Sequence, residues 1–385
     1  MKMLKTLDGL IIADFSMFVA GPFATGILAD LGAEVVKIEP LTGDPLRKNK
    51  VGPSVGGQSA QFQTFNHGKK SVTLDLKDKH GLEKAKKIAL NSDVVFDNFR
   101  PGVMEKFGLD HSKLAQDKPT LVSISLSGFG TISPWSKNPG YDLVVQALGG
   151  GLSINGHEET GPAHIPFHLG DTAGGLYAAI AILAAVQEAQ KTGFGRAYEV
   201  SMLDSQIHLC GDEVTFSGLD GWKTKPHGSG HPALAPYAVF ETEDKPIVIA
   251  AVGIEKFWLN FVSVIGSAEL ANDKRFTDNS KRASNMTELT KIINKKLSIN
   301  KRDFWLQKLV DADVPAAPIL SIDEVIHSEH VISQNQIDFI EVEGKKLAVP
   351  RIPIKEKGKI QSINLRAAPE LGEHNDGENQ AWRKD

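Results

Sequence analysis

Short apolar segments alternate with helical stretches over the first 130 residues, and this alternation limits the fold more than any other feature of the sequence. A predicted helix over 22–31, which opens on Pro22, separates the first two segments. A second predicted helix presents Leu82, Ala85, Ile88 and Ala89 on one face. The predicted strands are LIIADF (10–15), AEVVKIE (33–39), SVTLDL (71–76), DVVFDNF (93–99) and TLVSISLSGFG (120–130). Strands that alternate with helices form a mainly parallel sheet, so we expect an α/β domain.

The binding site of such a domain is expected at one edge of the sheet, because ligands bind beyond the carboxyl ends of parallel strands. The segments 19–22, 98–102 and 127–130 follow predicted strands, and all three contain glycine or proline. We therefore expect these three segments to line the site.

The length of 385 residues favours two domains. Residues 221–236 form a stretch rich in glycine and proline without periodicity, which is typical of a lid or a domain junction. A predicted hairpin with its turn at Glu243 and Asp244 follows, and helical patterns continue from about 255 to 312, so we expect a small second domain. A further hairpin is predicted at Glu343 and Gly344.

Charge, cysteine content and apolar runs argue against several classes of protein. The 43 Lys and Arg residues are interspersed with 47 Asp and Glu residues, so no basic stripe points to nucleic acid. The single cysteine, Cys210, cannot form an intrachain disulfide, which suits a reducing compartment. The longest apolar run, 176–186, is about half of the ~20 residues that span a bilayer. We therefore expect a soluble, cytoplasmic protein that does not enter a membrane.

Asp171 lies between the turn HLG and the most apolar helical run of the chain. One interpretation is a helix N-cap, whose carboxylate accepts hydrogen bonds from the first helical N–H groups. The other is a nucleophile, because Gly174 and Gly175 would let a bulky ligand approach the backbone although each costs about 1 kcal/mol in a helix. A helix N-terminus would also keep the carboxylate ionised, as attack on a thioester requires. Both interpretations are open at this point.

Glycine motifs for dinucleotides and nucleoside triphosphates do not occur. The chain has no G-x-G-x-x-G and no G-x-x-x-x-G-K-[ST]. The pairs His164/His168 and His227/His231 have four-residue spacing but lack the glutamate of H-E-x-x-H, so a metal site is not favoured.

Together the segments of this chain resemble the class III CoA-transferases, a family that includes formyl-CoA transferase, carnitine CoA-transferase and many dicarboxylate CoA-transferases. The matching segments follow in family order: LDGLIIADFSMFVAGPFAT, LGAEVVKIEP, NHGKKSVTLDLK, DNFRPG, LSGFG, NPGYDLVVQALGG, HLGDTAGGLYAAIAILAA, TGFGRAYEVSMLDS and APELGEH. The resemblance implies a Rossmann-like large domain with a mainly parallel sheet, an inserted small α+β domain and an interlinked homodimer. The corresponding ranges are 1–220 for the first part of the large CoA-binding domain, 221–325 for the small domain with its connecting loop, and 326–385 for the return to the large domain.

The resemblance also implies the site residues. Asp171 would be the catalytic nucleophile, coenzyme A (CoA) a substrate, and no tightly bound cofactor or metal would be needed. A mobile loop over 227–231, with Gly228 and Gly230, would shield the intermediates. The residues implied to contact CoA are Phe18, Val19, Ala20, Leu74, Lys77, Asn98, Phe99 and Lys106.

Departures from the family pattern bear on the reaction. Formyl-CoA transferase has glutamine where this chain has Val19, which argues against formate or oxalate exchange. The related α-methylacyl-CoA racemases have the motif G-H-D, and this chain has Tyr141 at the position of the histidine. A tyrosine, with an unperturbed pKa near 10, is poorly suited to carry the α-proton. Tyr141 is then either a hydrogen-bond donor to the acyl group or a buried structural residue. Arg47 would meet a phosphate or close a loop.

We therefore predict an enzyme that moves CoA from an acyl-CoA, such as succinyl-CoA or another short-chain or dicarboxylic acyl-CoA, to a carboxylic acid. The predicted intermediates are an aspartyl anhydride and an aspartyl-CoA thioester. The alternative on the same fold is an α-methylacyl-CoA racemase or epimerase. A catalytically silent CoA-binding scaffold and a nicotinamide oxidoreductase are further alternatives from other classes.

Overall fold

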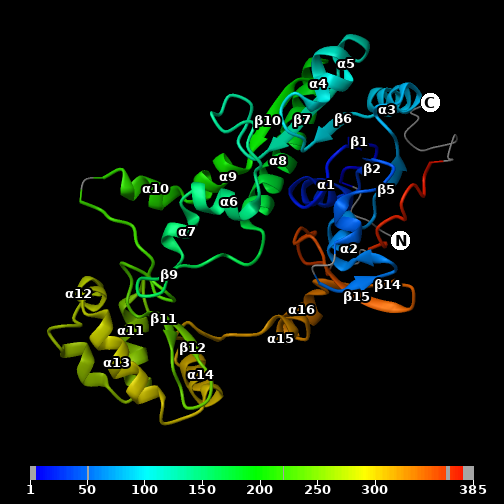
Figure 1. Cartoon of the computed structure of the whole chain (residues 1–385). Coiled ribbons are helices and arrows are strands. Elements are labelled where there is room, and N and C mark those ends of the chain that lie inside the picture. Colours follow the sequence, from blue (N-terminus) through cyan, green and yellow to red (C-terminus); the bar gives the residue numbers. More distant parts are fainter. Residues whose placement is uncertain (1–5, 50–51, 220, 361–364, 376–385) are drawn as a thin grey trace. The chain divides into compact units, whose positions relative to one another are not determined.

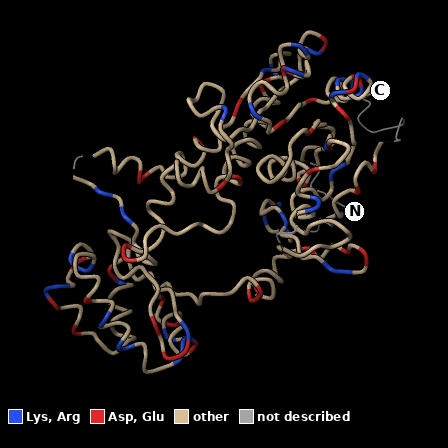
Figure 2. Tube along the Cα trace, in the orientation of Figure 1, with Lys and Arg blue, Asp and Glu red and all other residues tan. Residues whose placement is uncertain are grey.

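The structure is a computed structural model that describes residues 6–49, 52–219, 221–360 and 365–375. The chain divides into two compact units (Figure 1). Side chains of both charge signs are spread along each unit (Figure 2). The first unit takes the ranges 1–153, 164–224 and 326–385, and the second takes 154–163 and 225–325. The boundary predicted at residue 220 falls on a position outside the described residues.

The first unit is built on a six-stranded parallel sheet with the order β5-β2-β1-β6-β7-β10. Counted along the chain within this sheet, the order is 3-2-1-4-5-6, which is that of the Rossmann fold. The strands are β1 Ile11–Asp14, β2 Glu34–Glu39, β5 Lys70–Thr73, β6 Val94–Asp97, β7 Val122–Ser127 and β10 Ala197–Ser201. The predicted α/β fold with a central parallel sheet is confirmed, and β10 is a strand that the sequence pattern did not predict.

Helices cover both faces of this sheet because successive strand residues point to opposite sides. Ile12 of β1 belongs to the core shared with α1 and α8, whereas Ile11 and Ala13 belong to the core shared with α3 and α5. The helices of the first unit are α1 Ala20–Asp30, η1 Pro45–Lys48, α2 Ala60–Asn66, α3 Lys79–Asn91, α4 Val103–Phe107, α5 His111–Asp117, α6 Asp142–Leu148, α8 Leu169–Thr192, α9 Met202–Leu209, α10 Gly211–Ser217 and α16 Glu329–Gln334. The short helix α7 Gly151–Ile154 ends at the boundary with the second unit.

Helix α8 is longer than the apolar run that predicted it. Within the described part of the chain it is the one helix long and apolar enough to cross a membrane, a criterion that core helices of soluble proteins also meet. Its buried face, which includes Ala178 and Ile182, packs in the core with α1 and β7. Although the run is apolar on every side, Leu176, Ile180 and Leu183 on the other face are 37–59% exposed.

The second unit holds a three-stranded antiparallel sheet with helices packed around one apolar core. Its strands are β11 Tyr237–Phe240, β12 Ile247–Ala250 and β13 Ala316–Pro318, and its helices are α11 Glu255–Val264, η2 Ala268–Asn272, α12 Asn279–Ser284, α13 Met286–Leu297, α14 Arg302–Asp311 and α15 Ile322–Ile326, which ends at the boundary. The hairpin β8 Gly156–His157 and β9 Gly161–Pro162 belongs to this unit, although the sequence division leaves 154–163 in the first part. The Gly228 N–H joins it to the rest of the unit by donating to the Gly156 carbonyl oxygen at 2.8 Å.

The C-terminal part of the chain returns to the first unit. The hairpin predicted at Glu343 and Gly344 is formed by β14 Ile337–Val342 and β15 Lys345–Pro350. Further along, the Arg47 guanidinium donates to the Pro369 carbonyl oxygen at 2.8 Å, and the Gly372 N–H donates to the Ser71 hydroxyl at 3.0 Å. Arg47 also pairs with Glu39 at 2.7 Å, so it closes the loop between β2 and η1 and is not available to a phosphate.

Candidate active site

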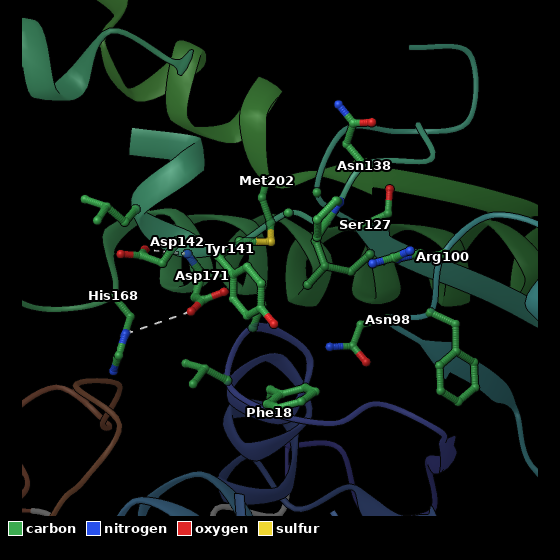
Figure 3. A pocket seen from close by; sticks show the side chains of 18 of the residues that line it. Phe18, Asn98, Arg100, Ser127, Asn138, Tyr141, Asp142, His168, Asp171 and Met202 are labelled. Atoms are coloured by element: carbon green, nitrogen blue, oxygen red, sulfur yellow. Dashed lines mark hydrogen bonds and ion pairs between the residues drawn. The ribbon is translucent and has the colours of Figure 1, made fainter. Parts of the chain in front are cut away.

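A cavity of about 620 Å³ is lined by residues that follow β1, β6 and β7. Strand order reverses between β1 and β6, and this is the place where a parallel sheet of this kind binds ligands. We call it the aspartate cavity (Figure 3), and Asp171 and Tyr141 lie in its wall. Its lining includes five of the residues predicted to contact CoA: Phe18, Val19, Ala20, Asn98 and Phe99.

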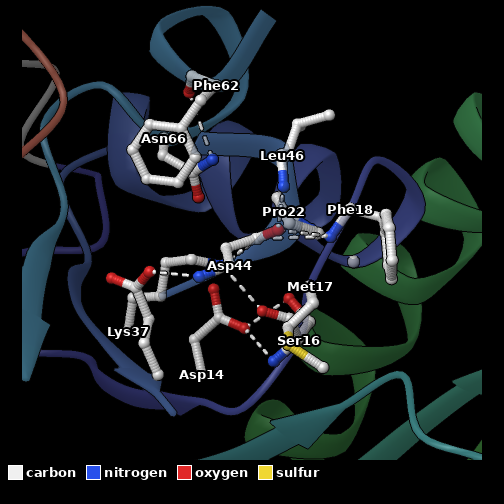
Figure 4. Close-up of polar contacts among 12 residues, drawn as sticks. Asp14, Ser16, Met17, Phe18, Pro22, Lys37, Asp44, Leu46, Phe62 and Asn66 are labelled. Atoms are coloured by element: carbon white, nitrogen blue, oxygen red, sulfur yellow. Dashed lines mark hydrogen bonds and ion pairs between the residues drawn. The ribbon is translucent and has the colours of Figure 1, made fainter. Parts of the chain in front are cut away.

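Buried charges hold the loop that follows β1 (Figure 4). Phe18 has a φ of +65°, which non-glycine residues rarely adopt, and its N–H donates to the Asp44 carboxylate at 3.2 Å. Lys37 pairs with Asp44 at 3.0 Å and donates to the Ser16 carbonyl oxygen at 2.7 Å, and all three are fully or almost fully buried. These bonds hold the backbone of Phe18 in place, so that its ring, which is 48% exposed, lines the cavity.

Asn98 joins the loop after β6 to the loop after β1. Its side-chain oxygen accepts from the Met17 N–H at 2.8 Å, and its amide nitrogen donates to the Met17 carbonyl oxygen at 2.7 Å. The Asn98 amide therefore holds together the two loops that line the cavity. The sequence predicted Asn98 only as a contact of CoA and did not predict this structural role.

A second cavity of about 360 Å³ adjoins the first, because Phe99 lines both. Leu74 and Lys77, which follow β5, line it among mostly apolar neighbours from β2, from α4 and from the segments after β1 and β2. We call it the adjacent cavity. Lys106 is exposed on α4 and lines neither cavity, so the structure does not bring it together with the other predicted CoA contacts.

Asp171 is not the cap of helix α8. The helix begins at Leu169, which places Asp171 in its first turn, and the N-cap residue is His168. The N–H groups of Gly170 and Asp171 instead donate to Oδ1 of Asp142, at 2.7 and 3.2 Å. The N-cap interpretation of Asp171 is therefore wrong, and Asp142, the first residue of α6, performs that role.

Burial raises the pKa of Asp171 to about 7, with a smaller contribution from the negative charge of Asp142. The sequence-based expectation that the helix N-terminus keeps this carboxylate ionised is contradicted, because Asp142 occupies the N–H groups that would have stabilised the charge. A carboxylate of raised pKa is more basic, and a pKa close to the working pH is typical of catalytic groups.

Gly174 and Gly175 have a different role from the one predicted. A Cβ at Gly175 would lie 2.7 Å from the Ala20 carbonyl oxygen of α1, and a Cβ at Gly174 would lie 3.0 Å from the Met202 side chain. The glycines therefore allow α8 to pack closely against α1 and α9, and no ligand is needed to explain them.

Tyr141 is 68% exposed, which excludes the buried structural role that the sequence left open. It precedes α6 as the N-cap residue and lines the aspartate cavity with Asp171. In the view of Figure 3 the rings of Tyr141 and His168 flank the Asp171 carboxylate, and Nδ1 of His168 lies 4.0 Å from Oδ2 of Asp171.

The remaining predicted residues lie elsewhere. Gly228 and Gly230 belong to the second unit, and Gly228 adopts a φ of +60°. The described residues contain no cluster of three or more His, Cys, Asp or Glu side chains that could hold a metal ion.

Sequence reasoning missed Asp142, Asp44 and Lys37, and it missed Gln61 of α2, which lines the aspartate cavity. The segment NPGYDL was noticed for its tyrosine, although its next residue, Asp142, caps helix α8 and accepts from the Asp171 N–H, 29 positions further along the chain. Lys37 is a charged residue inside the apolar strand AEVVKIE. Because a buried charge requires a partner of opposite sign, this pattern could have indicated an acidic partner, which is Asp44.

Comparisons with known proteins agree over most of the chain. The family model described as CoA-transferase family III matches residues 7–375. An acetyl-CoA:oxalate CoA-transferase of Acetobacter aceti is 34% identical over 95% of this chain and 93% of its own length, and a human succinyl-CoA:glutarate CoA-transferase is 32% identical over 97% and 85%. The crystal structure of a CAIB/BAIF family protein from Brucella suis superposes with a TM-score of 0.84 at 30% identity, covering 96% of this chain and 97% of that one. The chain therefore belongs to CoA-transferase family III and is an enzyme of that family.

Proposed function

We propose that this enzyme moves CoA from an acyl-CoA to a free carboxylic acid with Asp171 as its nucleophile. The observation that carries the proposal is the state of Asp171: its side chain is 17% exposed in the wall of the aspartate cavity, with a pKa raised to about 7. Asp142, the other carboxylate in the described lining of the cavity, accepts the helical N–H groups and a hydrogen bond from Gln146 at 2.8 Å. Asp171 is thus the carboxylate that can attack.

The reaction has two matched halves. An oxygen of Asp171 attacks the thioester carbonyl carbon, and the C–S bond breaks. CoA thiolate departs, and a mixed anhydride of Asp171 and the donor acid remains. The thiolate then attacks the aspartyl carbon of the anhydride, which releases the donor acid as its carboxylate and leaves an aspartyl-CoA thioester. The acceptor carboxylate then attacks the aspartyl-CoA thioester, which releases CoA thiolate and forms a second mixed anhydride. The thiolate attacks the acceptor's carbonyl carbon in this anhydride, so the new acyl-CoA is released, Asp171 returns to its starting state and no net proton is taken up.

CoA is proposed to lie across both cavities. The adjacent cavity has apolar walls and Lys77 at its edge, which suits an adenine ring and a phosphate. Phe99 lines both cavities, so a pantetheine arm passing it would bring the thioester to Asp171.

The anhydride and the thioester keep their energy only if water is excluded. We assign this shielding to the loop 227–231, whose Gly228 and Gly230 provide the freedom to move that a lid requires.

Short dicarboxylic acids are the proposed substrates. Curated relatives at 29–34% identity are named for oxalate, glutarate and mesaconate, and for citramalate and malate. Because one relative is named for oxalate, oxalate belongs in the substrate panel although Val19 argued against it.

Racemisation on the same fold is less well supported by the site. Two bases that exchange an α-proton must stand on opposite sides of the carbon, each within about 3 Å of the proton. His168 lies only 4.0 Å from Asp171, which leaves no room for a carbon atom between the two groups.

A homodimer in the cytoplasm completes the proposal. Leu176, Ile180 and Leu183 form an exposed apolar stripe along α8, which suits a contact with a second copy. The lone cysteine suits a reducing compartment.

A transfer assay tests the function. Purified enzyme is incubated with succinyl-CoA and a panel of acids that includes glutarate and oxalate, in deuterated water, and products are separated and weighed. Appearance of new acyl-CoAs with wild type, and their loss by at least 1000-fold in Asp171→Asn, is the expected result. Deuterium uptake at the α-carbon without transfer would establish the racemase instead.

A further inference from the structure

Gln61, His164 and His168 are among the residues that line the aspartate cavity. Gln61 contacts His168, and His164 lies 3.6 Å from Asp142, which stands on the His168 side of Asp171 in Figure 3, so we call this part of the cavity the imidazole end. In Figure 3 His168 stands on the opposite side of Asp171 from Asn98 and Arg100. Gln61 comes from α2, and the two histidines come from the segment before α8. The cavity therefore has two differently built ends on either side of the nucleophile.

Hydrogen bonds determine which nitrogen of His168 carries the proton. The Asn49 amide nitrogen donates to the Gln61 side-chain oxygen at 3.4 Å, and this orients the Gln61 amide. The Gln61 amide nitrogen then lies 3.0 Å from Nε2 of His168. Because an amide nitrogen only donates, Nε2 accepts and Nδ1 bears the proton. That N–H faces Asp171, with Nδ1 and Oδ2 at 4.0 Å.

The His168 backbone is fixed, and its ring is accessible. Its carbonyl oxygen accepts from both the N–H and the hydroxyl of Thr172 at 2.8 Å, as the first bonds of α8. The side chain is nevertheless 44% exposed in the cavity. A separation of 4.0 Å from Asp171 exceeds hydrogen-bond length, so the Nδ1–H can turn to an acceptor atom brought in by a substrate.

We infer that the imidazole end is the subsite for the acid substrate, in which the His168 Nδ1–H holds the reacting carboxylate beside Asp171 and His164 meets the second carboxylate of a dicarboxylic acid. The inference rests on the proposed function, which places CoA at the end with Phe99. The acid must then approach Asp171 from the other side, and it needs hydrogen-bond donors there because a carboxylate only accepts.

His164 suits the second carboxylate by its position and exposure. Its side chain is 46% exposed, and Nε2 lies 3.6 Å from Oδ2 of Asp142. Asp142 is 11% exposed and already accepts two backbone N–H groups and the Gln146 amide, so its carboxylate has hydrogen-bond donors without His164. Arg100 is the one Lys or Arg side chain in the described lining, and it stands at the CoA end. Recognition of the acid therefore depends on imidazole and amide groups.

Steady-state kinetics with saturating acyl-CoA and a varied acid test this subsite. His168→Ala is expected to raise the KM for every acid by at least 10-fold, while the Kd of free CoA from calorimetry stays within 2-fold of wild type. His168→Asn, whose amide nitrogen can occupy the place of Nδ1, is expected to recover part of the loss. His164→Ala is expected to raise the KM for glutarate but not for the monocarboxylic acid butyrate.

The matched control is His80→Ala, an exposed histidine of α3 outside the aspartate cavity, which is expected to change neither constant. An unchanged KM for acids in His168→Ala, or a change in the CoA Kd alone, would overturn the subsite while leaving the transferase function intact. Equal effects of His164→Ala on glutarate and butyrate would overturn the role of His164. Absence of transfer by wild type with every acid would overturn the proposed function and this inference together.

Discussion

Two carboxylates, Asp142 and Asp171, stand at the start of helix α8 and are held in different states by their surroundings. Asp142 accepts backbone N–H groups and the amide of Gln146, whereas Asp171 is buried without such donors and faces the charge of Asp142. The pKa of Asp171 is raised for these reasons, and this difference between the two carboxylates supports Asp171 as the proposed nucleophile.

The pH profile of Asp142→Asn tests this arrangement. Asp171 must be ionised to attack, so kcat/KM of wild type is expected to rise with pH through about 7 and then level off. Asparagine can still accept the Gly170 N–H but carries no charge, so the pKa of Asp171 falls and the midpoint of the profile moves to lower pH. The other ionisable groups at this place, His164, His168 and Tyr141, are unchanged in the variant.

The control for that profile is Asp212→Asn, which removes an exposed carboxylate of α10. Its midpoint is expected to equal that of wild type. A midpoint in Asp142→Asn that does not move would show that burial alone sets the pKa of Asp171.

At the residue scale the sequence could predict that Asp171 lies at the start of a helix, but not its environment. HLGDTAGG placed Asp171 at the start of a helix, because turn residues and an apolar run are adjacent in the chain. Asp142 and Gln61 reach the site from α6 and α2, and contacts of this range depend on how the elements pack.

At the element scale, the close packing of helix α8 against helix α1 determines where the aspartate cavity forms. Gly175 lies against the Ala20 carbonyl oxygen, immediately after the loop that carries Phe18 and Val19. The same helix pair therefore fixes both Asp171 and the loop that follows β1.

Gly175→Ala is expected to destabilise the protein by about 1–3 kcal/mol, because its Cβ would lie 2.7 Å from backbone oxygen. Helix propensity alone predicts the opposite sign. Urea denaturation followed by circular dichroism measures the change. Gly211→Ala at the start of α10, where a Cβ meets nothing within 4 Å, serves as the control and is expected to be neutral or slightly stabilising. Equal effects of the two substitutions would contradict the packing role of Gly175.

At the element scale the predicted parallel strands were found because apolar segments of β-branched residues alternate with amphipathic helices. Strand β10 was missed because it lies at the edge of the sheet, and its sequence AYEVS is only partly buried. The glycines of α8 were misinterpreted because glycines in a helix allow close approach by a ligand or by a neighbouring helix, and the sequence does not distinguish the two.

At the scale of the whole molecule, the two units are each assembled from separate stretches of the chain. Composition predicted a second domain after residue 220, since the glycine- and proline-rich stretch interrupts the helical pattern. It could not assign 154–163 to that unit, because the bond between Gly228 and Gly156 joins residues far apart in sequence. The return of residues 365–375 to the sheet was implied only by the family resemblance.

The exposed stripe of α8 predicts the oligomeric state. Ile180 is 59% exposed at the centre of the stripe, and Ile180→Glu is expected to convert a dimer to a monomer in light scattering after size exclusion. Ile132→Glu is the matched control, because Ile132 is 97% exposed in a loop, and it is expected to leave the dimer intact. A monomeric wild type, or a dimeric Ile180→Glu protein, would contradict this role of α8.

During turnover Asp171 is proposed to become covalently linked to acyl and CoA groups in turn. To test this, the enzyme is mixed with succinyl-CoA and quenched with hydroxylamine, and the peptide that contains Asp171 is weighed. We expect an aspartyl hydroxamate at Asp171 that requires the acyl-CoA and is absent in Asp171→Asn. Rapid transfer with no hydroxamate at that residue, or undiminished transfer by Asp171→Asn, would contradict it.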